Sequence, residues 1–494
     1  MILLFILAVP LAAGAMSFAA NKRPAMEKIN LGAFGLVLAL AGILVVQVLR
    51  DGRVSAWDGF LEADSLSALV VLLTAVVALA CSVYAIGYFR DERDHIMVSE
   101  LRKYYTLTPL FVFAMLMVAV ANNLGVMWVA TEATTLTSVF LIAFYGRATS
   151  LEAAWKYTMI GGVGLSMALF GTILTYYAAR NVPGADTLAG LNWSVLARNA
   201  PQFDGTTMKF AFILVLLGYG TKAGIAPMHT WKPDAYSEAP VPAAAMLAAG
   251  VLNCALYGLI RFHVLAARCV GPQFGSQLLI FFGLLSIGVA VPFVLVQKSF
   301  RRILAYSSID HGGIMILGLG FGGAFGALGM LLHMTFHSVT KPLLFFCAGN
   351  VQQRLKTDLF HRAKGGLIHA MPVTGSILMM AMLAVTGTPP FSLFQSEFTI
   401  LRAGVTGGHL VPTAFCVGFL VTIFAGFLVH FSRLVLGPVP AGHGSASNTE
   451  QEPCPWKKYS LIGLASIVVI LGFWLPRPLF ELIRNAARIA SGEP

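Results

Sequence analysis

The stretch GYGTKAGIAPMHTWKPDA, residues 218–235, decides how this chain folds. It continues an apolar run that should be one uninterrupted helix, yet it contains glycines at 218, 220 and 224 and a proline at 227. Glycine and proline are the residues that most destabilise a helix interior. A lysine, Lys222, stands among them. The stretch therefore predicts an interrupted helix that holds an ionisable side chain inside an apolar segment.

The composition predicts that this segment lies in a membrane. Of the 494 residues, 57% are hydrophobic and only 11% are charged, whereas a soluble domain has about 25% charged residues. Apolar runs of the length that crosses a bilayer recur about fourteen times. The first, MILLFILAVPLAAGAMSFAA, lacks a basic leading region and precedes many others, so we expect a transmembrane helix rather than a signal peptide. The expected fold is an all-α integral membrane protein with about 14 transmembrane helices.

The distribution of charge predicts the orientation in the membrane. The net charge of +11 could suggest a nucleic-acid partner, but lysine and arginine alternate in abundance between successive connections. The odd-numbered connections hold nineteen of these residues and the even-numbered connections seven. Cytoplasmic loops carry such an excess. We therefore expect no nucleic-acid partner, an even number of crossings, and both termini on the outer side.

Sequence motifs for bond-making chemistry are missing. The six cysteines are scattered without CxxC spacing, so the sequence predicts no iron–sulfur cluster and no zinc site. It contains no phosphate-binding loop, dinucleotide fingerprint or nucleophile elbow. We expect no cofactor, no metal and no catalytic redox chemistry in this chain.

A second interruption occurs in the other half of the chain. The sequence TGTPPF, residues 386–391, breaks the twelfth apolar run and is followed by Glu397. Transporters built from inverted repeats place broken helices at matching positions of their two halves. We therefore expect helices 1–3 in residues 1–106, a first repeat of helices 4–8 in 107–265, a second repeat of helices 9–13 in 266–437, and a polar linker with helix 14 in 438–494.

Two ionisable residues of the first repeat are candidates for function. Glu132 lies within the apolar fifth run. The alternative to a functional role is that its carboxylate is simply solvated at a helix end. Lys222 could instead extend its side chain to the interface, but the residues after it remain largely apolar for two turns. Ionisable residues inside a membrane are usually functional. A Lys222–Glu132 pair would hold or release a proton as the two groups approach or separate, which an arginine could not do.

The eleventh run contains three ionisable residues on one helical face. His333, His337 and Lys341 are spaced four apart, so their side chains project from the same side of a helix. The spacing could suit a metal, but no carboxylate or thiol ligand accompanies them in sequence. Imidazoles exchange protons near neutral pH, so we interpret these residues as a proton relay.

For the remaining ionisable candidates, a structural or solvated role is an alternative to a role in transport. Glu397 could pair with Arg402 at the interface rather than act in transport. Lys156 could extend to the headgroups, and acidic residues of the connection after the seventh helix could simply be solvated. The accessory candidates are Lys156, His229, Asp234, Glu238, Asp310 and His311.

Several of these segments resemble a known family. The runs GYGTKAGIAPMHTWKPDAYSEAPVPAAAM and LNCALYGLIRF look like the signature of the antiporter-like, proton-translocating subunits of respiratory complex I. The runs QKSFRRILAYSSIDHGGIMILGLGFGG, HMTFHSVTKPLLFFCAGN and GTPPFSLFQSEFTIL resemble most closely component F of membrane-bound hydrogenases of the hydrogenase-4 and formate hydrogenlyase type. The similarity covers nearly the whole chain in the expected order.

The resemblance implies fourteen helices, two inverted five-helix repeats and a hydrated polar axis. It places Glu132 and Lys222 on the family's glutamate and lysine of helices five and seven, and Glu397 on its terminal acid. The eleventh-helix residues fall on its central relay. Asn253 departs from the family, which often has a lysine or histidine there, and Phe336 and Pro342 are unusual neighbours of the relay residues.

These observations predict a subunit that moves protons or sodium ions across a bacterial inner membrane, driven by redox centres in partner subunits. The alternatives are a subunit of a multisubunit cation/proton antiporter, the membrane part of an inorganic-carbon uptake system, and a structural anchor with vestigial polar residues.

Overall fold

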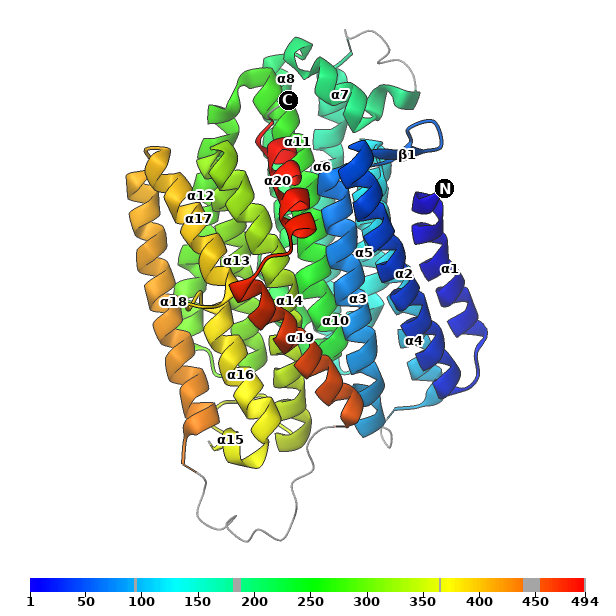
Figure 1. Ribbon diagram of the computed structural model, residues 1–494, viewed down its shortest axis with the longest axis vertical. Helices are drawn as coiled ribbons and strands as arrows, with labels where there is room; N and C mark the ends of the chain where they lie inside the picture. Colours follow the sequence, from blue (N-terminus) through cyan, green and yellow to red (C-terminus); the bar gives the residue numbers. More distant parts are fainter. Residues whose placement is uncertain (93–95, 181–187, 364–365, 439–453, 493–494) are drawn as a thin grey trace.

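The computed structural model describes residues 1–92, 96–180, 188–363, 366–438 and 454–492. These residues form a bundle of long helices, most of which run along one common direction (Figure 1). The first part comprises α1 (Ile2–Ala19), α2 (Arg23–Asp51), α3 (Ser65–Asp91), α4 (Val98–Val120), α5 (Leu124–Ile142), α6 (Ala148–Ala178), α7 (Trp193–Asn199), α8 (Gly205–Ala223), α9 (Trp231–Glu238), α10 (Val241–Met246) and α11 (Leu252–Val270). The second part comprises α12 (Pro272–Val296), α13 (Phe300–Phe321), α14 (Gly323–Leu355), α15 (Leu367–Ala370), α16 (Pro372–Val385), α17 (Ser392–Thr406), α18 (Leu410–Leu436), α19 (Pro455–Phe473) and α20 (Arg477–Ser491).

Eleven helices in the described part of the chain are long and apolar enough to cross a membrane. Their burial follows their position: the segment of α10 and α11 and helix α13 are enclosed on all sides, whereas α12 and α18 expose broad apolar faces. A helix that is apolar all round belongs in the interior or against lipid. The fold is thus an all-α, multi-pass membrane bundle.

The three other expected crossings fall on α8 with α9, on α14, and on α16 with α17. These segments are interrupted or carry polar side chains, which lowers their mean hydropathy. The total of fourteen crossings and the inverted relation of the two repeats stay predictions.

Both predicted helix interruptions are present. Helix α8 ends before Gly224, whose φ of +70° is left-handed, and the chain becomes helical again at Trp231. Helix α16 is followed by Gly387 with φ +64°, and α17 begins at Ser392. Each link contains one cis peptide bond, before Pro227 and before Pro390. A further irregularity, the π-helical turn Leu247–Val251, joins α10 to α11.

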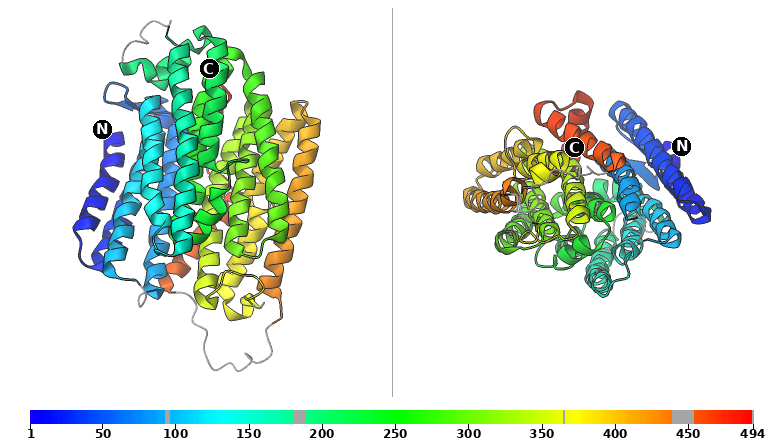
Figure 2. Two further views of the ribbon diagram at one scale, coloured as in Figure 1. Left: turned by 180° about the vertical axis from the view of Figure 1, so that it is seen from behind. Right: turned by 90° about the horizontal axis from the view of Figure 1, so that it is seen from below.

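The C-terminal region differs in detail from the expected fourteenth span. An apolar run over residues 461–480 predicts one helix, but the chain leaves the helical conformation between α19 and α20 because Pro476 precedes a new helix start. Helix α20 packs against α3 and α14. Most of the predicted polar linker, residues 439–453, lies outside the described residues. Both chain ends lie toward the same end of the bundle (Figures 1 and 2).

That same end carries a small cap. Strands β1 (Val54–Ala56) and β2 (Leu61–Ala63) form an antiparallel hairpin in which Val54 pairs with Ala63. The hairpin and helix α7 lie beside the ends of α3 and α11 (Figure 1). They cover the polar cluster described below.

Candidate functional site

Lys222 occupies the last turn of α8, at the first helix interruption. It is 2% exposed, and its Nζ donates hydrogen bonds to the Thr135 hydroxyl (2.8 Å) and the Tyr157 hydroxyl (2.7 Å). The Tyr157 hydroxyl lies 2.8 Å from that of Ser138. The amine is therefore held by hydroxyl groups of α5 and α6 inside the bundle and does not extend to the interface.

Glu132 lies on α5, one turn before Thr135, and is half-buried. Its charge interacts with that of Lys222, but the ion pairs among the described residues do not join the two groups. The carboxylate oxygen Oε2 has no hydrogen-bond partner in the described structure. Glu132 and Lys222 are thus separated, with the hydroxyls of α5 and α6 taking the contact that a direct pair would make.

Lys232, on α9, is a buried lysine whose position the sequence does not predict. Its local sequence is typical of an aqueous connection, and it is one of the nineteen basic residues counted in the odd-numbered connections, yet it is 1% exposed. Its Nζ donates to the carbonyl oxygens of Ala223 (2.7 Å) and Ser308 (3.2 Å). That assignment is wrong because α9 folds back into the bundle after the interruption, which the local sequence does not show.

Imidazole groups from two helices, α13 and α14, lie close together. His333 on α14 lies between His311 of α13, at 2.9 Å from ring nitrogen to ring nitrogen, and the hydroxyl of Ser396 on α17, at 3.0 Å. His337 packs with its ring centroid 5.1 Å from that of His311. Both of its ring nitrogens are buried without a hydrogen-bond partner among the described residues. Buried polar groups are normally satisfied, so the His337 imidazole is one of the exceptions among the described residues.

Lys341 lies on α14, one turn beyond His337, and is fully buried. Its Nζ donates to the carbonyl oxygen of Leu304 at 3.0 Å. Asp310 is also buried and interacts electrostatically with Lys341, while its Oδ1 has no partner among the described residues. The structure therefore brings both accessory candidates of α13, Asp310 and His311, next to the predicted relay.

Glu397 follows the second interruption and points back toward it. It is 8% exposed. It lines a cavity of about 320 Å³ between the interruption and α18, together with Thr386, Thr388 and the ring of Phe398. This placement favours an interior role over the alternative of an interfacial pair with Arg402.

Ligand atoms of His311, His333 and Glu397 lie within 4.8 Å of one another. The sequence argument against a metal, that no carboxylate accompanies the histidines, does not hold in three dimensions, because α17 brings Glu397 to them. Nitrogen and carboxylate ligands of this kind suit zinc and similar ions. The same groups also suit proton exchange.

The remaining accessory candidates divide between the interior and one end of the bundle. Asn253 is fully buried and donates to the Ser338 hydroxyl at 2.7 Å. His229, in the link between α8 and α9, is 9% exposed. Asp234 contacts Lys156 (3.1 Å) and Arg302, and Glu238 accepts a hydrogen bond from Thr149. These surface contacts favour a structural role for Lys156, Asp234 and Glu238.

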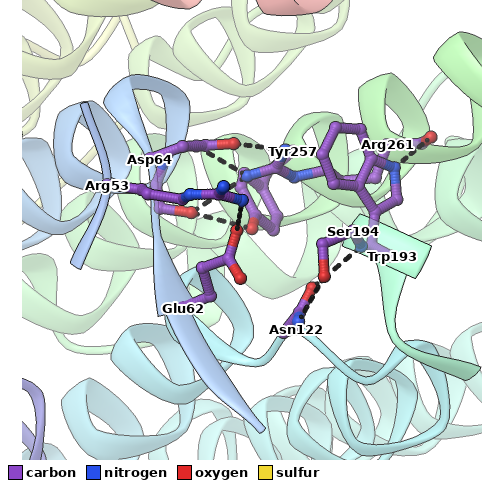
Figure 3. Close-up of polar contacts among 9 residues, drawn as sticks. Arg53, Glu62, Asp64, Asn122, Trp193, Ser194, Tyr257 and Arg261 are labelled. Carbon is purple, nitrogen blue, oxygen red and sulfur yellow. Dashed lines mark hydrogen bonds and ion pairs between the residues drawn. The ribbon is translucent and has the colours of Figure 1, made fainter. Parts of the chain in front are cut away.

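A separate buried polar cluster lies under the hairpin (Figure 3). The guanidinium of Arg261 on α11 forms two hydrogen bonds with the carboxylate of Asp64, at 2.7 and 2.8 Å, and stacks on the ring of Trp193. Burial raises the pKa of Glu62, which lies beside them in β2. A cavity of about 10 Å³ within the cluster has room for about one water molecule.

The sequence does not predict this cluster. Arg261 stands near the end of one apolar run, and Asp64 stands at the start of another. Aspartate directly before an apolar run is a helix N-cap signal, and Asp64 does accept a hydrogen bond from the backbone N–H of Ser67. That signal gives no sign of the ion pair, since the two residues are 197 positions apart.

Together these side chains form a buried series of proton-binding groups across two interrupted helices. Lys222 stands just before the first interruption, Glu397 follows the second, and the histidines and Lys341 are buried on α13 and α14. Such a series defines the class of polytopic ion-translocating membrane subunits.

The comparisons name the family. The chain matches the family described as "NADH:quinone oxidoreductase/Mrp antiporter, TM" over residues 121–424. It belongs to this family.

Individual relatives agree with that membership. The chain is 33% identical over 435 residues to a hydrogenase-4 component F homolog of Methylacidiphilum infernorum, covering 83% of this chain and 90% of the relative. It is 25% identical to the NADH-quinone oxidoreductase subunit N of Parvibaculum lavamentivorans, over 93% and 90% of the two chains. A chain of the archaeal membrane-bound sulfane sulfur reductase superposes with a TM-score of 0.87 at 25% identity, over 99% and 97%. A chain of the Mrp complex from Dietzia sp. shares the fold, with a TM-score of 0.84 at 19% identity, over 99% and 96%.

Proposed function

We propose that this chain translocates protons across the membrane as one subunit of a multisubunit redox complex. The observation that carries the proposal is the buried series from Lys222 through the histidines to Glu397. Each ionisable group inside a membrane costs about 2 kcal/mol or more, so a chain that keeps several of them in one series uses them. Electron transfer takes place in the partner subunits, because the sequence of this chain shows no motif for a redox centre.

Transport by this site requires the distance between Glu132 and Lys222 to change. When Glu132 approaches Lys222, its negative charge favours the ammonium form, and when it withdraws, burial favours release of the proton. The hydroxyls of Thr135 and Tyr157 accept hydrogen bonds from the ammonium while the proton is held. The released proton moves toward the histidines of the second repeat and leaves past Glu397.

The relatives support a redox partner of the hydrogenase or NADH-quinone oxidoreductase type, as their names state. The likeness to the Mrp complex supports a second candidate, a subunit of a cation/proton antiporter. The membrane is the bacterial inner membrane, with both termini on the periplasmic side, which accounts for the excess of positive charge in the opposite connections.

The test is purification of the intact complex through an affinity tag on this chain. We expect hydrogenase-like or dehydrogenase-like subunits to co-purify, and the complex in proteoliposomes to acidify or alkalise the lumen in a sodium-free buffer when hydrogen or NADH is supplied. Co-purification of antiporter subunits alone would contradict the redox part of the proposal. Flux that requires sodium would contradict the choice of ion.

A further inference from the structure

Lys232 is a buried lysine with an unusual set of partners. Two backbone carbonyl oxygens, of Ala223 and Ser308, accept its hydrogen bonds. The ion pairs found in the described part of the chain do not include it. Burying a charge without a counter-charge is costly unless the group can become neutral. A lysine can lose its proton in such a place, whereas an arginine cannot.

The first helix interruption provides the space for this side chain. A Cβ atom on Gly224 would lie 2.6 Å from Cδ of Lys232 and 3.1 Å from its Nζ. The left-handed φ of +70° at Gly224 also favours glycine. The interruption therefore does more than end α8 beside Lys222, because it admits a second lysine to the interior.

The two carbonyls place Lys232 between the repeats. Ala223 directly follows Lys222 on α8, and Ser308 precedes Asp310 and His311 on α13 by less than one helical turn. Lys232 thus lies at the junction between the Lys222 site and the relay of the second repeat.

The eighth crossing has no ionisable group at this junction. Asn253 reaches the relay helix through its hydrogen bond to Ser338, but an amide cannot take up or release a proton at physiological pH. A side chain on another element has to carry the proton from one repeat to the other.

We propose that Lys232 is this carrier, receiving a proton from Lys222 and passing it to the histidines of α13 and α14. This inference rests on the proposed function of proton translocation. In the first step the Lys222 ammonium becomes a neutral amine and Lys232 becomes an ammonium, through a bridging water. In the second step Lys232 returns to the neutral amine as a neutral imidazole takes the proton, so one proton advances and both lysines are restored after Lys222 is reprotonated.

The opposing explanation is that Lys232 only anchors α9 to α8 and α13. Lys232→Arg distinguishes a proton carrier from a structural anchor, because arginine keeps the positive charge and the hydrogen-bond donors but cannot release a proton. Lys232→Gln is the second variant, which keeps a donor for the carbonyls without any charge. Lys209→Arg, on the exposed face of α8, is the matched control.

The experiment uses the tagged complex in proteoliposomes, with proton flux, subunit composition and electron-transfer rate measured on each sample. We expect Lys232→Arg and Lys232→Gln to assemble and to lose at least tenfold in proton flux, with Lys209→Arg equal to wild type. Adding Asn253→Lys to Lys232→Gln should recover part of the flux, since an ionisable group returns to the junction. Wild-type flux in either Lys232 variant would overturn the proposal. A wild-type complex without flux would instead contradict the proposed function, so the two failures are distinct.

Discussion

At the scale of single residues, glycines at the two interruptions make room for ionisable side chains. Gly224 leaves space for Lys232, and Gly387 leaves space for Glu397, whose carboxylate oxygen would overlap a Cβ at that position. Both glycines have left-handed backbone. The helix-breaking residues of the sequence therefore do two things: they end the helix, and they admit charge to the interior.

Gly387→Ala tests this role of the glycine. We expect lower thermal stability of the purified complex and reduced proton flux, because the new methyl group displaces the Glu397 carboxylate. Gly408→Ala is the matched control: its φ is also left-handed, at +79°, but nothing lies within 4 Å of a Cβ there. Both variants bear a backbone cost of about 1–2 kcal/mol, because alanine must adopt a left-handed conformation. Equal stability and flux in the two variants would contradict the steric explanation.

The Tyr157 hydroxyl supplies a second test at this scale. Tyr157→Phe removes one of the two acceptors that hold the Lys222 ammonium, and a hydrogen bond to a charged group contributes about 1.5–3 kcal/mol. We expect proton flux to fall severalfold while the complex stays assembled. Tyr105→Phe is the control, since its buried hydroxyl lacks a partner among the described residues and lies on α4. A similar loss in Tyr105→Phe would show a general packing effect.

Among the elements, the buried Asp64–Arg261 ion pair joins the start of α3 to α11 at one end of the bundle. Arg261→Met leaves the Asp64 carboxylate buried without its counter-charge, which typically costs about 3–5 kcal/mol. We expect a marked fall in the unfolding temperature in detergent. Arg50→Met removes an exposed partner of Asp51, with the two side chains 75% and 46% exposed, and should leave the unfolding temperature nearly unchanged because exposed ion pairs contribute little. Comparable shifts in the two variants would contradict a stabilising role for the buried pair.

The same elements show what the sequence could and could not predict. Runs of apolar residues located the crossings, and glycine and proline located both interruptions, because these signals are local. The spacing of His333, His337 and Lys341 correctly predicted one face of one helix. Their contacts with His311 and Ser396 depend on how α13, α14 and α17 pack.

The burial of Lys232 and the pairing of Asp64 with Arg261 escape prediction for the same physical reason. A lysine beside a proline and an aspartate has the local character of an aqueous loop, and only the return of α9 into the bundle removes it from water. The two members of the ion pair come from distant segments, so no local pattern connects them. Glu397 could be found from the sequence, but its closeness to His311 and His333 could not.

At the scale of the whole molecule, both termini lie toward one end of the bundle (Figure 1). The charge asymmetry predicts that this end faces the periplasm. Alkaline phosphatase fused to the C-terminus should therefore be active in cells, and green fluorescent protein at the same position should be dark. A fluorescent green fluorescent protein fusion together with an inactive alkaline phosphatase fusion would contradict the orientation.

The central claim is that the buried series carries protons and that Lys222 is needed for it. Its most direct test is the proton flux of the purified complex in proteoliposomes with Lys222→Met, which keeps most of the side-chain volume and removes the amine. The account predicts an assembled complex whose proton flux is abolished. Wild-type proton flux in an assembled Lys222→Met complex would contradict it.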